Sequence, residues 1–334
     1  MNLKRKSYSP KGREVLPAGG NFVDRRDRTW ENQGWWFGVG KEILSALSLL
    51  GVAAVWGATF YFVREALQDI APFHFLFYRF MVASVFLLPW AVKTRLSRIP
   101  KALLHGSAAG LLLFGGYAFQ TVGLQYTSAS KAAFITGLSV VMVPFLEAAA
   151  KRKAPPIRIL VATSLAAAGL GLLSLQGSLN LSYGDRLVFL CALCFAGHVV
   201  VIDRVTHLHG STALALVQLV TVTLLSASFL PWEPSRVVWS ARALEALVVT
   251  SVLATSAAYL IQVRAQRYLS ASAAAVILTT EPVFGALVAF LFGGEVLGPR
   301  QILGCALILG GMVGAQERRP QPEGFTGGTQ RGYP

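Results

Sequence analysis

Charged side chains are scarce in this sequence. Asp, Glu, Lys and Arg together make up 14% of its 334 residues, whereas soluble domains contain about 25%. Hydrophobic residues make up 54%, and the mean hydropathy is +0.54. The shortage of charge and the apolar composition exclude an ordinary soluble domain and indicate an all-α polytopic membrane protein.

Cysteine is also scarce, and a phosphate-binding loop is missing. Cys191, Cys194 and Cys305 all fall within apolar runs. Cys191 and Cys194 have the spacing of a metal-binding pair, but no second pair or histidine cluster accompanies them, so we interpret them as buried core residues. No Walker-type Gly-rich loop is present, so the sequence offers no ATP site. We predict neither a cofactor nor a metal site.

The net charge of +14 does not indicate a nucleic-acid partner. Lys and Arg lie in the terminal segments and in alternate connections, above all at 93–101, 151–158 and 264–267, without the basic stripe of a nucleic-acid-binding domain. In membrane proteins such residues concentrate in cytoplasmic loops. The distribution therefore predicts a multi-pass protein of the cytoplasmic (inner) membrane with both termini in the cytoplasm.

Ten apolar stretches approach the length of about 20 residues that crosses a bilayer. The connections between them are short, which leaves little room for a soluble catalytic domain. Residues 1–42 are polar and basic, residues 317–334 are rich in Pro and Gly, and both are predicted to be disordered tails. The predicted spans are 43–64, 72–92, 102–124, 130–150, 157–176, 184–203, 211–231, 242–263, 271–292 and 299–316.

The two halves of the chain align without a gap at an offset of 142 residues. Tyr117 then falls on Tyr259, Gln120 on Gln262, and Gly169 on Gly311. These matches indicate a duplication, with one repeat at 43–176 and the other at 184–316. Because each repeat has five spans, an odd number, the second is predicted to be inverted relative to the first. Inverted repeats are typical of transporters, whose substrate site lies at the midplane between the halves.

The stretch from 270 to 295 carries one carboxylate, Glu281, near the middle of a predicted span. A charge near the bilayer centre costs at least ~2.5 kcal/mol, so such a residue usually serves a pathway or a binding site. Pro282 follows directly and lacks a backbone donor, which predicts a helix break. Pro144 predicts a second break in the first repeat.

These features resemble the drug/metabolite transporter superfamily, of the ten-helix EamA type, over about residues 43–316. In the first repeat the resemblance rests on residues 127–138 and Pro144; in the second it rests on Ser270-Ala271-Ser272, Glu281-Pro282, Gly294-Glu295, Gly304, Gly310 and Gly311. The sequence departs from the family pattern at 151–153, where Lys-Arg-Lys replaces Gly-Glu, and at Ser139, which aligns with Glu281. The resemblance implies a secondary transporter that exports amino acids, drugs or other small metabolites.

Several polar and aromatic residues within the spans are candidates for binding substrate. Arg79 could bind a carboxylate through two N–H groups, or its side chain could extend to the interface as an anchor. Tyr117 and Gln120 are three residues apart and share a helix face, as do Tyr259 and Gln262 in the other repeat. These side chains could line a cavity or hold helices together. Trp56 and Tyr78 offer flat surfaces for a ligand, or serve as packing residues. The predicted substrate-binding residues are Trp56, Tyr78, Arg79, Tyr117, Gln120, Tyr259 and Gln262.

Two residues are candidates for coupling transport to a proton gradient. Glu281 could carry a proton or bind a substrate amine, or it could be a neutral structural acid beside the helix break. His198, which aligns with Trp56, could relay protons or be a hydrogen-bonded packing residue.

The sequence thus predicts a membrane transporter rather than an enzyme. The predicted partners are a small-molecule substrate and the lipid bilayer, with protons as a candidate coupling ion and no nucleic acid. Whether the protein is a monomer or a homodimer stays open. One alternative is a membrane-embedded enzyme acting on a lipid-linked substrate; another is a receptor or scaffold that transports nothing.

Overall fold

The computed structural model describes residues 40–93, 99–127, 129–174, 182–234, 237–292 and 297–315. Within these ranges almost every residue outside the connections is helical, and the one strand-like pairing is an isolated bridge between Ile70 and Val237. The prediction of an all-α fold is therefore confirmed. The predicted tails lie outside the described residues, apart from residues 40–42.

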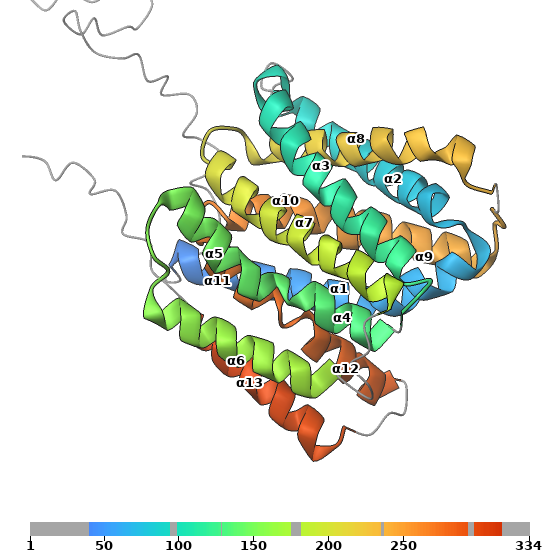
Figure 1. Ribbon diagram of the computed structural model, residues 1–334. Helices are drawn as coiled ribbons and strands as arrows, with labels where there is room; N and C mark the ends of the chain where they lie inside the picture. Colours follow the sequence, from blue (N-terminus) through green and yellow to red (C-terminus); the bar gives the residue numbers. More distant parts are fainter. Residues whose placement is uncertain are drawn as a thin grey trace, which may run out of the picture. The chain divides into compact units, whose positions relative to one another are not determined.

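Thirteen α-helices follow one another along the described chain (Figure 1). A 3₁₀ turn, η3 (Leu230–Trp232), follows α8, and a π-helix, η4 (Val252–Ala257), joins α9 to α10. The α-helices are α1 (Lys41–Asp69), α2 (Pro72–Lys93), α3 (Ile99–Gly123), α4 (Ala129–Gly137), α5 (Ser139–Lys151), α6 (Ile157–Ser174), α7 (Tyr183–Val205), α8 (Ser211–Phe229), α9 (Ala241–Ser251), α10 (Ala258–Ala265), α11 (Ala271–Leu278), α12 (Glu281–Phe292) and α13 (Pro299–Ala315).

The helices have the length and surface of membrane spans. Eight helical segments of 18 or more residues are apolar enough to cross a bilayer, and two further apolar helices, Ile157–Leu173 and Pro299–Ala315, are shorter. Many large apolar side chains point away from the bundle; Leu104 is 78% exposed and Ile157 75%. Such a surface suits lipid rather than water. The chain is a multi-pass membrane protein, while the count of ten spans stays a prediction.

Contacts between connections define two ends of the helix bundle. At one end, Lys151 Nζ lies 3.5 Å from Asp203 Oδ2, which joins the last turns of α5 and α7. At the other end, the Glu233 carboxylate accepts a hydrogen bond of 2.9 Å from the Phe73 N–H at the start of α2. We call these the Lys151 end and the Glu233 end. The α1 helix finishes at the Glu233 end, where the Asp69 carbonyl accepts from the Val238 N–H at 2.9 Å, so α1 and α7 run in opposite directions.

Helices from the two halves pair at both sides of the bundle. Figure 1 shows α6 beside α13 at one side and α2 beside α8 at the other. The α6 and α13 backbones approach closely: a Cβ on Gly169 would lie 2.5 Å from the Gly304 carbonyl oxygen, and one on Gly311 would lie 2.6 Å from the Ala162 carbonyl oxygen. Since Gly169 aligns with Gly311, and Ala162 with Gly304, the two contacts are related by the repeat offset.

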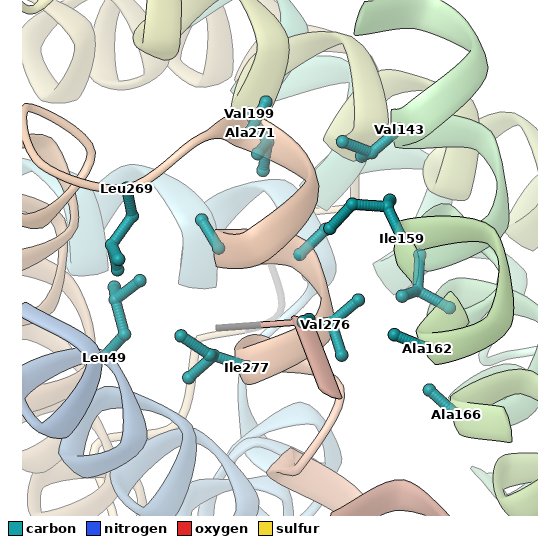
Figure 2. Close-up of a cluster of buried hydrophobic side chains, with 14 of the residues drawn as sticks. Leu49, Val143, Ile159, Ala162, Ala166, Val199, Leu269, Ala271, Val276 and Ile277 are labelled. Carbon is teal, nitrogen blue, oxygen red and sulfur yellow. The ribbon is translucent and has the colours of Figure 1, made fainter. Parts of the chain in front are cut away.

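The main apolar core also draws on both halves. Figure 2 shows its side chains, among them Leu49 of α1, Ile159 of α6, Val199 of α7 and Ile277 of α11. Leu49 is fully buried and Ile159 and Ile277 nearly so. Burying a side chain of this size stabilises the fold by about 1.5–3 kcal/mol where water is the alternative, and by less within lipid, where close packing decides. The halves therefore form one packed body.

Two helices are interrupted at repeat-related positions. The α4 helix ends at Gly137 and α5 starts at Ser139, while α11 ends at Leu278 and α12 starts at Glu281. Residues 138 and 280, which lie within the two interruptions, are one repeat offset apart. In the second interruption the hydroxyls of Thr279 and Thr280 donate to the carbonyls of Ala275 and Ile277 at 2.8 and 2.7 Å. These carbonyls also accept the backbone N–H groups of the same two residues, so both hydroxyls are satisfied inside the span.

The prolines relate to these interruptions in different ways. Pro282 is the second residue of α12, where the missing N–H costs no helical hydrogen bond. Pro144 lies inside α5, so the first interruption differs from the predicted one and occurs six residues earlier, beside Gly137. Glycine is a poor helix former, whereas a proline inside a membrane helix is tolerated when neighbouring groups satisfy the freed carbonyl.

Candidate functional site

Arg79 occupies the centre of the candidate site. It is 4% exposed, and its Nε donates to Thr255 Oγ1 at 2.8 Å and its Nη2 to the Tyr117 hydroxyl at 3.3 Å. The guanidinium carbon also lies 4.9 Å from the centre of the Tyr117 ring, within cation–π distance. The side chain is thus held inside the bundle, with further N–H groups to offer to an anion.

Tyr117 meets its own repeat-related partner. The Tyr259 hydroxyl donates to the Tyr117 hydroxyl at 2.9 Å. Trp56 of α1 lies beside them, with its ring centre 5.6 Å from that of Tyr259 and its Nε1 donating to the Ala254 carbonyl at 2.7 Å. Four predicted binding residues, three from the first half and one from the second, therefore gather where the halves meet: Trp56, Arg79, Tyr117 and Tyr259.

The π-helix η4 supplies a residue that sequence reasoning missed. Thr255 is fully buried within η4, accepts the Arg79 hydrogen bond, and donates to the Thr250 carbonyl at 2.8 Å. The wider turn of a π-helix leaves room for such a side-chain contact, and π-bulges often mark functional sites. The hydroxyl residues of this otherwise apolar span, Thr255 and Ser256 among them, were the signal available in the sequence.

Glu281 begins α12 and faces the same region. Its side chain is half-buried, and its carboxylate interacts electrostatically with Arg79 and with Tyr259. In the part of the chain that the structure describes, no residue forms a hydrogen bond or an ion pair with this carboxylate. A second ionisable group is therefore close to Arg79 and available to a ligand or a proton.

Gly57 brings α1 against the start of α12. A Cβ at this position would lie 2.3 Å from the Glu281 carbonyl oxygen and 2.8 Å from the Gly285 nitrogen. Both atoms belong to the backbone and cannot rotate away. The glycine thus sets the position of Glu281 relative to α1.

We expect Gly57→Ala to destabilise the protein by about 1–3 kcal/mol, as overpacking does, and to lower its melting temperature in detergent. Gly51→Ala is the matched control, since it lies on the same helix with nothing within 4 Å of a new Cβ. There alanine should leave the melting temperature unchanged or raise it, because it is the better helix former. Equal melting temperatures for the two variants would contradict the close approach.

His198 contacts the site from α7. It is 2% exposed, its Nε2 lies 2.7 Å from Gln218 Oε1 of α8, and its ring packs edge-on against Tyr259 at 5.9 Å. This geometry accommodates both predicted roles, a hydrogen-bonded packing residue and a proton relay.

The remaining predicted binding residues lie apart from Arg79. Gln120 Nε2 donates to Thr136 Oγ1 at 3.3 Å, between α3 and α4. Gln262 Nε2 donates to Gln266 Oε1 at 3.3 Å, toward the Lys151 end. Tyr78 packs edge-on against Trp239, 5.0 Å away, near the Glu233 end. The structure brings together the repeat-related tyrosines but not the glutamines.

A pocket of about 460 Å³ opens at the Glu233 end. Phe73, Phe229, Trp232 and Glu233 are among the residues that line it. Phe114, one turn before Tyr117 on α3, has its ring centre 6.3 Å from that of Phe73 and 5.6 Å from that of Phe229. An aromatic layer thus lies between the pocket and the Arg79 site.

The chain matches one family model and resembles proteins that are named as transporters. Residues 43–175 and 182–315 each match the model of the EamA-like transporter family. An uncharacterized transporter of Archaeoglobus fulgidus is 35% identical over 273 residues, covering 80% of this chain and 84% of that protein. The uncharacterized transporter YyaM of Bacillus subtilis is 26% identical over 291 residues, covering 80% and 92%.

A solved crystal structure shares the fold. It is 18% identical, with a TM-score of 0.69, and the match covers 81% of this chain and 96% of that one. This likeness concerns the arrangement of helices alone.

Proposed function

Because the chain belongs to the EamA-like transporter family, we propose that it is a secondary transporter that exports small metabolites. Substrate binds at Arg79, Tyr117, Tyr259 and Trp56, and the two halves expose this site alternately to either side of the membrane. The supporting observation is that the buried guanidinium and the paired tyrosines lie where the two halves meet, as expected for inverted repeats.

Three features support the inverted arrangement. The α1 and α7 helices, which are equivalent in the two repeats, run in opposite directions. The interruptions at 138 and 280 are separated by the repeat offset of 142 residues. The two close contacts between α6 and α13 also convert into each other when the offset is applied. A site on the axis relating the halves can face either side by the same rocking motion. Without a phosphate-binding loop in the sequence, the driving force comes from an ion or substrate gradient.

The Arg79 site suits a solute with a carboxylate or another planar anion. The guanidinium is pre-oriented by Thr255 and by the Tyr117 ring, and the mutually tilted rings of Trp56 and Tyr259 lie nearby. Glu281 adds a group that can bind a substrate amine or a proton. Amino-acid-like metabolites have this combination of groups, and drug-like compounds with an anionic group and an aromatic ring fit part of it.

A ligand screen followed by a flux assay tests the function. Purified protein is heated with a panel of metabolites, and a true ligand at about 100 times its Kd should stabilise the fold by about 2.7 kcal/mol. The hits are then loaded into proteoliposomes. We expect flux of at least one hit, absent from liposomes with Arg79→Ala protein. Binding without flux of any hit would favour a receptor.

We further propose that the Lys151 end faces the cytoplasm. Lys151, Lys153, Arg158 and Arg204 gather there, as expected for cytoplasmic loops. Single cysteines at Gln68, near the Glu233 end, and at Asn180 should react with an impermeant thiol reagent added to intact cells. A cysteine at Ser97 should react only after the cells are opened. External labelling at Ser97 would refute both the orientation and the inverted repeat.

A further inference from the structure

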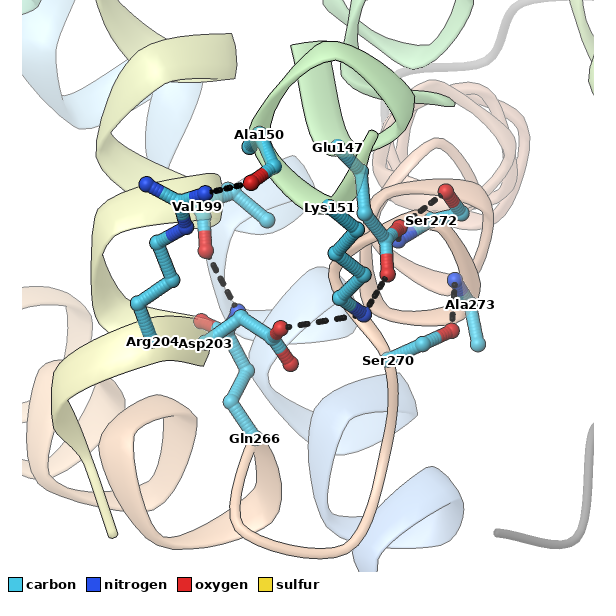
Figure 3. A network of polar contacts seen from close by, with 10 residues as sticks. All are labelled: Glu147, Ala150, Lys151, Val199, Asp203, Arg204, Gln266, Ser270, Ser272 and Ala273. Atoms are coloured by element: carbon cyan, nitrogen blue, oxygen red, sulfur yellow. Dashed lines mark hydrogen bonds and ion pairs between the residues drawn. The ribbon is translucent and has the colours of Figure 1, made fainter. Parts of the chain in front are cut away.

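Four polar residues join the two halves at the Lys151 end, and we call them the Glu147 clamp: Glu147 and Lys151 of α5, Asp203 of α7 and Ser272 of α11. Figure 3 shows their contacts. The Glu147 carboxylate accepts hydrogen bonds from the Ser272 N–H at 2.9 Å, from the Ser272 hydroxyl and from the Lys151 ammonium. The same ammonium lies 3.5 Å from Asp203 Oδ2.

Three members of the clamp are shielded from solvent, whereas the Lys151 side chain is 44% exposed. Glu147 is 9% exposed, and Asp203 and Ser272 are each 5% exposed. Moving α5 away from α11 takes the Lys151 and Ser272 hydrogen bonds from the buried Glu147 carboxylate, which is costly. Gln266, which donates to the Val199 carbonyl at 2.8 Å, adds a hydrogen bond between the α10–α11 connection and α7 beside them.

One short helix connects the clamp to the candidate site. The α11 helix starts at Ala271, next to Ser272, and ends at Leu278, just before the interruption and Glu281. Eight residues of α-helix span about 12 Å. A displacement of the α11 start at the clamp is therefore transmitted to the peptide segment that carries Glu281.

The residues that form the clamp are not repeated at the equivalent positions of the other half. At the repeat offset, Glu147 corresponds to Ala289, Lys151 to Gly293 and Asp203 to Tyr61. None of these residues carries a charge, so they cannot form the same ion pairs. The Glu233 end carries the pocket of about 460 Å³ and different ion pairs between the halves, His74 with Glu233 at 2.9 Å and Arg242 with Asp69 at 3.8 Å. The two ends are thus held closed by unequal interactions.

We propose that the Glu147 clamp is the gate of the Lys151 end, and that Glu147 is a positioning residue for transport. The proposal rests on the transport function proposed above. The clamp holds the Lys151 end shut while the site communicates with the Glu233 end, and it must separate each time substrate enters or leaves through the Lys151 end. Replacing Glu147 shifts the protein toward states in which that end is open.

Two reporter cysteines measure the shift. In full-length protein with Cys191, Cys194 and Cys305 replaced by alanine, Ala271→Cys reports on the Lys151 end, where Ala271 is fully buried, and Val122→Cys reports on the pocket at the Glu233 end. Each is reacted in detergent with a small soluble maleimide. With Glu147→Ala added, we expect labelling at Ala271→Cys to rise at least tenfold and labelling at Val122→Cys to fall.

The reciprocal change separates a gate from a purely structural role. If Glu147 only stabilised the fold, its loss would increase labelling at both reporter cysteines. An increase at both, or no change at either, would overturn the proposal. Lys151→Met is the second variant, should Glu147→Ala not fold, and the same opposite changes are expected. Glu245→Gln, an exposed carboxylate on α9, is the control and should alter neither reporter.

Flux distinguishes failure of the gate from failure of the function. Labelling requires no transported solute. Opposite changes at the two reporters without flux of any solute would therefore support the gate proposal and contradict the proposed transport function. Flux in the wild type, with reporter labelling that does not change in the Glu147 variant, would support the transport function and contradict the gate proposal. Where both hold, Glu147→Gln, which keeps an acceptor for Ser272 but loses the charge, should give labelling between that of wild type and of Glu147→Ala.

Discussion

Arg79→Lys should reduce transport of a carboxylate-bearing substrate roughly tenfold to a hundredfold while the protein still folds. Lysine keeps the positive charge but cannot present the planar pair of N–H groups that binds a carboxylate. It also cannot bond Thr255 and Tyr117 in the same geometry. A charged hydrogen bond contributes about 1.5–3 kcal/mol, which sets this range. Initial flux into proteoliposomes, at equal protein content, measures the loss.

Arg242→Lys is the matched control, because the Arg242 side chain is 59% exposed at the Glu233 end. It should transport like wild type. Tyr117→Phe removes one acceptor of the Arg79 hydrogen bonds while leaving the ring, so its loss should be smaller than that of Arg79→Lys. Wild-type flux in Arg79→Lys would exclude direct carboxylate binding by the guanidinium and leave Arg79 as a structural residue.

Much of the fold could be predicted from the sequence, because in a membrane protein apolar length alone marks the helices. The repeat offset adds long-range information. It pairs Tyr117 with Tyr259, and the structure places these two hydroxyls 2.9 Å apart. A residue on the axis between two repeats must meet its own equivalent, whereas Gln120 and Gln262 lie off that axis and find different partners.

The site depends on features that hydropathy does not record. The π-helix that presents Thr255 is a local change in hydrogen bonding within a uniformly apolar span. The position of Glu281 depends on the missing side chain of Gly57 on a distant helix. The first interruption falls at residue 138 rather than at Pro144 because neighbouring groups, not the proline alone, decide where a helix ends.

Glu147 illustrates a different limit. A carboxylate within an apolar stretch is visible in the sequence, as Glu281 was, but its meaning depends on its neighbours. Glu147 is bonded to Lys151 and Ser272, whereas the Glu281 carboxylate has no hydrogen-bond or ion-pair partner among the described residues. The first acid is satisfied by protein contacts, and the second remains available for chemistry. Only the three-dimensional arrangement separates these two cases.

Glu281→Gln should abolish accumulation driven by a pH gradient while substrate exchange across the membrane continues. Glutamine matches glutamate in size and still accepts hydrogen bonds, but it cannot take up and release a proton in each cycle. No described residue forms a hydrogen bond or an ion pair with the Glu281 carboxylate, so the substitution breaks no such contact and removes only the electrostatic interaction with Arg79. The variant should therefore fold and insert. Proteoliposomes with an imposed pH gradient measure accumulation, and preloaded ones without a gradient measure exchange.

Each result assigns a role to the carboxylate. Loss of accumulation with intact exchange identifies Glu281 as the proton-coupling group, since exchange needs the binding site and the conformational change but no net proton movement. Normal accumulation would contradict this role and make His198, which contacts Tyr259, the next residue to test. Loss of both activities in folded protein would mean that Glu281 binds substrate directly beside Arg79. Glu245→Gln, at an exposed carboxylate of α9, should retain both activities and controls for the loss of a negative charge.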